Sequence, residues 1–292
     1  MSPAGRPLPG LPGAEAGDPL PLVARIGRTV RTGAHVRRAI FLGHTVAAAL
    51  GDGTVRFLAP GDVGPRTVKV HAGTILCAAA TADRTGILTG GDDGRLALTV
   101  PDGTTRLLDE DGRWIDAVAA AERGRCVFAR GRSVTVLGPD GPIDEIAVPS
   151  SGPGLAVSAD GRRVAIAHLD GATVIDAAAP GGGTRLFWTG AHIAATFSPD
   201  GRFLVTAMNE NALHGWRLSD GADMAMTGYP SKPRSLSWSG DGWWLASSGA
   251  DGVILWPFKG KKGPMGKAAA VIGRRSTLVT AVACHPESDV VA

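Results

Sequence analysis

The sequence repeats a short pattern at intervals of about forty residues, and this period limits the possible fold more than any other feature. The segment TFSPDGRFLVTA (196–207) is followed forty residues later by LSWSGDGWWLASS (236–248), with the same order of aromatic, serine, Asp-Gly and apolar residues. A second tight turn occurs in each repeat. Its central positions, which are 41, 37, 40, 40 and 41 residues apart, are Gly53, Gly94, Gly131, Gly171, Asn211 and Gly252. A period of this length indicates a repeat architecture.

Each repeat reads as four short strands separated by tight turns. In the fifth repeat the apolar runs are HIAATF (192–197), RFLVTA (202–207), ALHGWRL (212–218) and MAMTG (224–228). Asp-Gly and Pro-Asp-Gly turns between such runs are typical of antiparallel hairpins, and four strands per forty residues are typical of a propeller blade. The hairpin position needs a positive φ, so glycine is expected there, with Asn211 as the tolerated exception. No helical periodicity is sustained over twelve residues, which argues against an α-solenoid.

The repeats predict an all-β fold, a β-propeller of four-stranded antiparallel blades. Six blades are expected to be complete, and STLVTAVACHPESDVVA (276–292) predicts a seventh that is truncated at the C-terminus. A closed ring would then be seven-bladed, with PLVARIGRTV (21–30) as an outermost strand. Residues 1–20 read as a disordered Pro/Gly-rich leader, and residues 21–292 as one propeller domain. The adjacent Trp243 and Trp244 are expected to fill the core on opposite faces of a blade.

Beyond these patterns, the chain resembles a divergent WD-repeat β-propeller. The segment VHAGTILCAAATADRTGILTGGDDGRLAL (70–98) is the most similar to the family consensus, with His71, Thr89 and Asp93 at its histidine, hydroxyl and aspartate positions. The resemblance implies that these groups form a buried hydrogen-bonded tetrad with a tryptophan, whose position here is occupied by Thr99.

Two later repeats keep other parts of this tetrad. The fifth has Thr206 and Trp216, with Glu210 in place of the acid and no matching histidine, and the sixth has Trp256. No repeat ends in Trp-Asp. The resemblance implies that partners bind the loops at one end of the propeller.

Composition and charge exclude several classes of protein. The net charge of +3 is too small for a dedicated nucleic-acid binder, and no apolar run approaches the length of a membrane span or a signal peptide. Three cysteines without a CxxC pair suit a reducing compartment, so we expect a cytoplasmic protein. The abundance of alanine, glycine and arginine beside few lysines suggests a bacterial source.

The sequence contains no recognisable catalytic constellation. Walker loops, HExxH, GxSxG and dinucleotide fingerprints are absent, and the seven histidines never adopt ligand spacing. We therefore expect a protein that is not an enzyme and needs no cofactor or metal. A site at the central channel stays open as an alternative. By residue type alone, its candidates are His168, His192, His214 and Glu210.

The most individual feature is the segment KGKKGPMGK (259–267), which holds four of the six lysines of the chain: Lys259, Lys261, Lys262 and Lys267. It is either a basic hairpin tip that contacts an anionic partner or a solvated loop that protects a sheet edge. The expected function is a monomeric, non-catalytic protein-interaction scaffold with an unidentified, acidic protein partner. A propeller enzyme or a small-ligand or metal-binding protein is the alternative. Phosphate-backbone binding through the lysines is a weaker third possibility.

Overall fold

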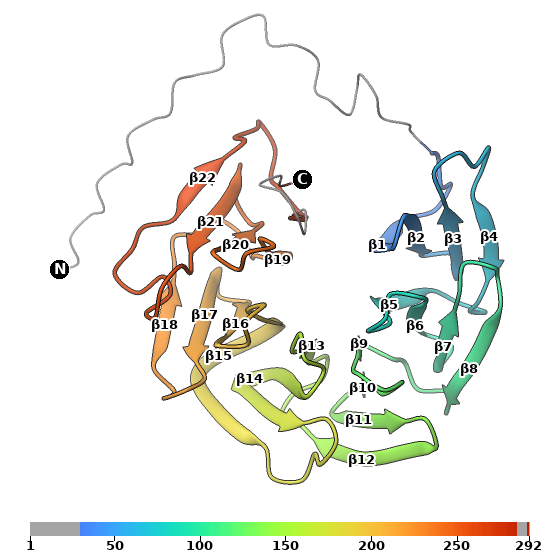
Figure 1. The fold of residues 1–292 in the computed structure, drawn as a ribbon, viewed down its shortest axis with the longest axis horizontal. Coiled ribbons are helices and arrows are strands. Elements are labelled where there is room, and N and C mark those ends of the chain that lie inside the picture. Colours follow the sequence, from blue (N-terminus) through green and yellow to red (C-terminus); the bar gives the residue numbers. More distant parts are fainter. Residues whose placement is uncertain (1–29, 285–290, 292) are drawn as a thin grey trace, which may run out of the picture. The chain divides into compact units, whose positions relative to one another are not determined.

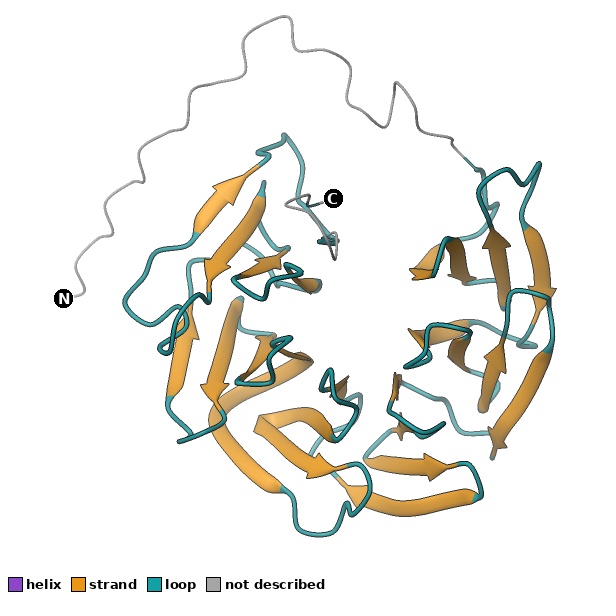
Figure 2. Cartoon of the chain, viewed as in Figure 1, coloured by secondary structure: helices purple, strands orange, loops and turns teal. Residues whose placement is uncertain are grey.

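The computed structural model describes residues 30–284 and residue 291 of the 292-residue chain. The chain divides into two units, residues 1–33 and 34–292. The predicted leader (1–20) and the predicted outermost strand, apart from Val30, lie outside the described residues. The described residues of the second unit form strands and loops and no helix (Figure 2).

The strands form five antiparallel sheets that follow one another in chain order around a common axis (Figure 1). The first contains β1 (Val36–Leu42), β2 (Thr45–Leu50), β3 (Thr54–Leu58) and β4 (Arg66–Lys69). The second contains β5 (Ile75–Ala80), β6 (Ile87–Gly91), β7 (Arg95–Thr99) and β8 (Thr105–Glu110). The third contains β9 (Ala117–Ala120), β10 (Cys126–Arg130), β11 (Ser133–Gly138) and β12 (Gly141–Ala147). This is the arrangement of a β-propeller, as the repeats predict.

The fourth sheet has six strands, and the fifth has four. The six-stranded sheet contains β13 (Gly154–Val157), β14 (Arg163–Asp176), β15 (Thr184–Phe197), β16 (Phe203–Met208), β17 (Ala212–Arg217) and β18 (Asp223–Met226). The last sheet contains β19 (Leu236–Trp238), β20 (Trp244–Ser247), β21 (Val253–Pro257) and β22 (Ala270–Ile272).

The predicted count of six complete blades is wrong, because one sheet takes the place of the fourth and fifth. β14 bends at Asp170 and Gly171, whose φ angles are 60° and 132°, and the Ala177 N–H donates to the Arg162 carbonyl at 2.7 Å. The pairing of β14 with β15 continues on the other side of this bend, where Leu169 pairs with Ala191. β15 then pairs with β14 through its first half and with β16 through its second half.

The truncated seventh blade is also not formed by the described residues. Residues 276–284 contain no strand, only an isolated bridge between Cys284 and Val291. They lie instead beside the last sheet: the Cys284 N–H donates to Ser237 Oγ at 2.9 Å, and Val279 exchanges backbone hydrogen bonds with the 249–250 turn. The backbone groups of Val279 and Cys284 therefore bind the last sheet instead of pairing with further strands of a separate seventh blade.

Apolar packing between neighbouring sheets holds the fold together. The cluster around Val55 and Ile75 joins the first and second sheets, and the cluster around Leu88 and Phe128 joins the second and third. Further clusters join the third sheet to the fourth, the two halves of the fourth to each other, and the fourth to the last. Because sheets pack on both faces, β6, β10 and β16 are buried along their whole length.

Positive φ angles occur at five of the six predicted hairpin positions. Gly53 and Gly94 both have φ of 79°, and Asn211 has φ of 56°, so the asparagine does adopt the left-handed conformation expected of it. Gly252 is the exception. A Cβ there would lie 2.8 Å from the Ile272 carbonyl oxygen, so close backbone approach, and not φ, favours glycine at this position.

Replacement of Gly94 by alanine tests how much a steric contact of the new Cβ adds to the loss of stability that a positive φ already causes. A Cβ on Gly94 would lie 2.5 Å from the Gly112 backbone, whereas Gly112 has almost the same φ, 80°, with nothing within 4 Å of its Cβ position. We expect Gly112→Ala to lower the free energy of unfolding by about 1 kcal/mol and Gly94→Ala by clearly more. Urea denaturation of both variants measures the difference, and equal losses would show that the contact is relieved at no cost.

Candidate functional site

The lysine loop, residues 259–267 between β21 and β22, is a folded element of the surface. All four of its lysines are exposed, whereas Gly263 and Pro264 are buried beneath them. Positive φ angles at Gly260, Gly263 and Gly266 bend the chain. A Cβ on Gly263 would lie 3.1 Å from the Phe203 ring, so the loop packs closely on the neighbouring sheet.

Two arginines of the six-stranded sheet hold the lysine loop by its backbone. Arg202 Nη1 donates to the Gly260 carbonyl and Arg217 Nη1 to the Lys261 carbonyl, each at 3.2 Å. Asp220 accepts hydrogen bonds from Arg217 and fixes its guanidinium. The loop is therefore anchored through carbonyl oxygens, and its lysine side chains take no part in the anchor.

The lysine amines form no ion pair with a carboxylate of the described residues, although the pKa of the nearby Asp241 is lowered by the hydrogen bond from Ser239 and further by the charge of Lys259. Lys259 Nζ lies 3.4 Å from the centroid of the Trp243 ring, and Lys267 Nζ donates to the Lys259 carbonyl at 2.7 Å. Within residues 30–284 and 291, no ion pair joins any of the four lysines to an acidic residue. Their positive charge is available to an external anion.

The prediction that Trp243 and Trp244 fill the core is wrong. Trp243 is 45% exposed and Trp244 is 39% exposed. Both follow directly on the Asp241–Gly242 turn, and β20 begins only at Trp244, so the rings lie at the end of the sheet where no neighbouring sheet covers them fully. Trp243 contributes instead to the surface, as the ring beneath Lys259.

A basic cavity of about 540 Å³ adjoins the lysine loop. Arg163, Arg202, Arg217 and Lys261 line it, and Asp220 is the one carboxylate in its wall. Arg163 is held in place because its Nη2 donates to the Gly201 carbonyl at 2.9 Å. We call this space the arginine cavity; its charge suits an anionic group.

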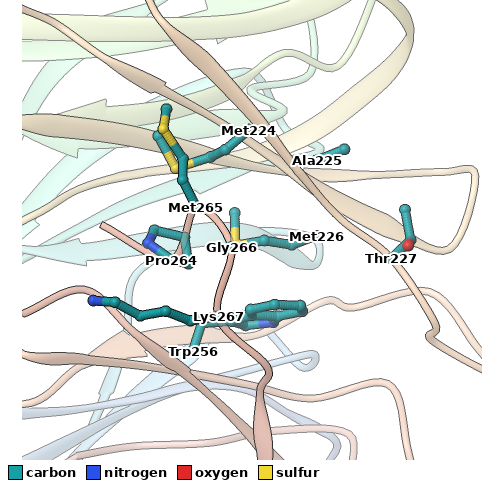
Figure 3. A pocket seen from close by; sticks show the side chains of 9 residues that line it. All are labelled: Met224, Ala225, Met226, Thr227, Trp256, Pro264, Met265, Gly266 and Lys267. Carbon is teal, nitrogen blue, oxygen red and sulfur yellow. The ribbon is translucent and has the colours of Figure 1, made fainter. Parts of the chain in front are cut away.

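A second cavity, of about 370 Å³, is lined by residues 264–267 of the same loop (Figure 3). Met224 and Met226 of β18 line it together with Met265 of the lysine loop, and Trp256 and Lys267 also face it. We call it the methionine cavity. Methionine side chains adapt to differently shaped apolar groups, so the methionine wall of this cavity suits an apolar side chain, while polar groups make up the larger part of its exposed lining.

The candidates for a channel site lie together in the six-stranded sheet, where each has hydrogen-bond partners or is packed in the interior. His168 contacts Thr173 Oγ1 at 2.9 Å and the Leu169 carbonyl at 2.8 Å. Glu210 accepts hydrogen bonds from the Ala191 N–H at 3.0 and 3.2 Å. Among the residues that the structure describes, no group of three or more His, Cys, Asp or Glu side chains is placed to hold a metal ion.

In the second repeat, three of the four residues at the WD-repeat tetrad positions are in contact, whereas the Thr99 hydroxyl pairs with Thr105 Oγ1 at 3.2 Å. His71 lies 2.9 Å from Asp93 Oδ1 and 2.8 Å from Thr89 Oγ1, and Asp93 also accepts from the Ala72 N–H at 2.9 Å. Burial acts to raise the pKa of Asp93, but the hydrogen bonds from His71 and the Ala72 N–H outweigh it and hold this pKa below its usual range.

The fifth repeat has a matching histidine, contrary to the expectation from its sequence. His192 Nδ1 lies 2.7 Å from Thr206 Oγ1, and Thr206 Oγ1 donates to the His214 carbonyl at 3.1 Å. Trp216 packs on both imidazoles. The repeat pattern does not reveal the match because the order is shifted: Glu210 binds the N–H of the residue before His192, whereas Asp93 binds the N–H of the residue after His71.

In the sixth repeat a tyrosine takes the place of the histidine. Tyr229 Oη lies 2.6 Å from Ser247 Oγ and accepts from Trp256 Nε1 at 2.7 Å. Tyr229 is the one tyrosine of the chain and stands outside the repeating order of residues, so the pattern carries no signal for it. Burial raises its pKa to about 12 despite the hydrogen bonds with Ser247 and Trp256, which keeps the phenol neutral.

Removal of the threonine hydroxyls tests whether these networks stabilise the fold. Thr89→Val and Thr206→Val keep the side-chain volume but leave a buried nitrogen of His71 or His192 without its partner. We expect each to lower the free energy of unfolding by about 1–3 kcal/mol. Thr135→Val on β11, where the structure gives the hydroxyl no hydrogen bond among the described residues, is the control and should stay within about 0.5 kcal/mol of the wild type. Losses no greater than the control's in urea denaturation would contradict the assignment.

His214 on β17 is fully buried, and neither ring nitrogen has a hydrogen-bond partner among the described residues. Its ring stacks on that of Trp188, with the centroids 4.0 Å apart. Burial, with a further contribution from the charge of His192, lowers the pKa of His214 to about 4. Burial likewise lowers the pKa values of His168 and His192. All three imidazoles are therefore neutral at neutral pH.

The lowered pKa of His214 predicts a loss of stability in mild acid. An unfolded histidine titrates near pH 6.5, so below about pH 6.5 the unfolded chain binds a proton that the folded chain does not, and the loss grows as the pH falls to about 4. His214→Phe keeps a ring against Trp188 and removes the titrating group. We expect its thermal midpoint to fall less than that of the wild type between about pH 7.5 and about pH 5. An equal fall in both proteins would contradict this role.

Comparison with protein-family models finds no match, and comparison with curated proteins finds no significant match. The propeller arrangement consequently rests on the structure itself. Among the described residues, no helix has the length and apolar character that crossing a membrane requires.

Proposed function

We propose that this chain is a non-catalytic, WD-repeat-like protein-interaction module that binds acidic segments of partner proteins. Its binding surface, which we call the basic surface, combines the lysine loop with the arginine cavity. The residues assigned to it are Lys259, Lys261, Lys262, Lys267, Arg163, Arg202 and Arg217.

One observation carries the proposal: the lysine loop is anchored by arginines while its own lysines form no ion pair with a carboxylate among the described residues. Asp200 and Asp220 are engaged by the arginines and Asp241 interacts with Lys259, and these three acids offset only part of the local positive charge. An external anion that lies between the loop and the arginine cavity would relieve the remaining repulsion. A solvated loop that only protects a sheet edge would need no such anchor.

A protein ligand fits this surface better than nucleic acid does. The positive charge is confined to one loop and one cavity, and the net charge of the chain is only +3. Trp243 also places an aromatic surface beside the lysines, which suits a side chain with mixed apolar and charged character. The proposal includes a cytoplasmic location, supported by the three free thiols Cys77, Cys126 and Cys284.

The proposal is tested by fluorescence anisotropy with a fluorescein-labelled peptide rich in Asp and Glu. We expect Lys261→Ser with Lys262→Ser to weaken binding about tenfold, because each lost charge contact contributes roughly 0.5–1 kcal/mol. Arg38→Ser with Arg106→Ser removes the same charge from exposed positions on β1 and β8 and is the matched control. We expect the control to bind like the wild type.

Two results would overturn the proposal. Equal weakening by the control would show that the peptide responds to overall charge and not to the basic surface. Tighter binding of a single-stranded oligonucleotide of equal charge, with a steep dependence on salt, would assign the surface to nucleic acid instead.

A further inference from the structure

The outer edge of the six-stranded sheet is open beside the methionine cavity. β18 is the last strand of that sheet and pairs with β17 on one side, and no described strand pairs with it on the other. All of residues 224–227 line the methionine cavity, including Ala225, which points away from the buried methionines. The cavity therefore borders the edge of the strand itself and not only one face of it.

The side chains of β18 alternate in a way that continues into this cavity. Met224 and Met226 are buried in the apolar cluster between the six-stranded sheet and the last sheet, while Asp223 and Ala225 are exposed. A strand added to the edge would place every second side chain on the same face as the two methionines. Such a side chain would enter the cavity between them and Met265 (Figure 3).

We propose that an extended segment of the partner protein adds as a strand to the edge of β18, with an apolar side chain in the methionine cavity and acidic residues on either side of it. Main-chain hydrogen bonds to a sheet edge and side-chain pockets on alternate residues are an established mode of peptide recognition. This inference rests on the proposed function and specifies the class of segment that is bound.

Charge determines what kind of segment fits. Lys267 lines the cavity and is exposed, so an acidic residue that flanks the apolar side chain would face its positive charge. A second copy that paired the same edge, β18 with β18, would bring one lysine loop against another, which like-charge repulsion opposes. The charge of Lys267 favours an acidic segment of a partner protein as the occupant.

The test uses the full chain and three fluorescein-labelled peptides. The first is Asp-Glu-Asp-Glu-Leu-Glu-Asp-Glu-Asp, the second has Ser in place of Leu, and the third is the leucine peptide with alternate backbone amides N-methylated, prepared in both alternating patterns. We expect the serine peptide to bind at least tenfold more weakly than the leucine peptide. One N-methylation pattern should weaken binding to a similar degree and the other much less, because only alternate amides of an added strand face the edge.

A protein variant locates the apolar side chain. Met265 is half-buried on the lysine loop and packs against the apolar cluster between the six-stranded sheet and the last sheet, so Met265→Ser removes one side chain from the wall of the cavity and from the border of that cluster. We expect it to weaken binding of the leucine peptide at least fivefold and to leave the serine peptide unaffected. Leu107→Ser, at an exposed position on β8, is the control and should change neither. Thermal midpoints of both variants establish that they are folded.

The outcomes separate this inference from the proposed function. If all peptides bind alike and Met265→Ser has no effect, while Lys261→Ser with Lys262→Ser still weakens binding, strand addition is overturned and the acidic ligand stands. If no peptide binds the wild type, both are overturned. If the leucine peptide is preferred and both N-methylation patterns are tolerated, the cavity binds a side chain without strand addition, and the inference is overturned in that form.

Discussion

Face-to-face packing of neighbouring sheets is the constraint on which the rest of this structure depends. Among the described residues, each apolar cluster lies between two sheets, except one that lies between the two halves of the six-stranded sheet: the residues that bury Phe57 come partly from the next sheet, and those that bury Phe203 come partly from the last one. Burial of one large apolar side chain contributes about 1.5–3 kcal/mol to the free energy of unfolding. Here that burial requires two sheets, or the two halves of the six-stranded sheet, to be packed against each other. This requirement explains the forty-residue period of the sequence. Each unit packs against its neighbours through similar apolar faces, so the same pattern of apolar residues recurs in every unit.

That requirement explains why the propeller arrangement could be predicted and the division into blades could not. Apolar runs and turn residues such as Gly53 and Asn211 depend on local geometry, which the sequence specifies directly. Whether two units share a sheet depends on whether the strand pairing continues past the bend at Asp170, as it does here, where Leu169 pairs with Ala191 after a register shift between Leu169 and Gly171. The same Asp-Gly signal ends a strand elsewhere, so no local pattern distinguishes the two cases.

The sequence alone identified some residues of the buried hydrogen-bond networks and of the basic surface, but not others. His71, Thr89 and Asp93 follow the order of a known pattern, and that order leads to their contacts. His192 and Tyr229 reach equivalent hydroxyl groups from other positions in the chain, so only the folded backbone reveals them. Trp243 and Trp244 obey the alternation of a strand, but they lie at its end, where burial depends on what the neighbouring sheet covers. Likewise, the lysines were visible in the sequence, but the arginines beside them come from different repeats.

The backbone anchor of the lysine loop has a consequence for how this surface can change over evolutionary time. Arg202 and Arg217 bind the carbonyl oxygens of Gly260 and Lys261, and every residue type supplies a carbonyl. The loop's position is thus set by the neighbouring sheet and by its glycines, together with the contacts that Lys259 and Lys267 make with Trp243 and with the Lys259 carbonyl, and independently of the side chains at 261 and 262. Substitutions at 261 and 262 can replace one binding preference with another while the scaffold keeps its shape, so recognition and stability are free to evolve separately at these two positions.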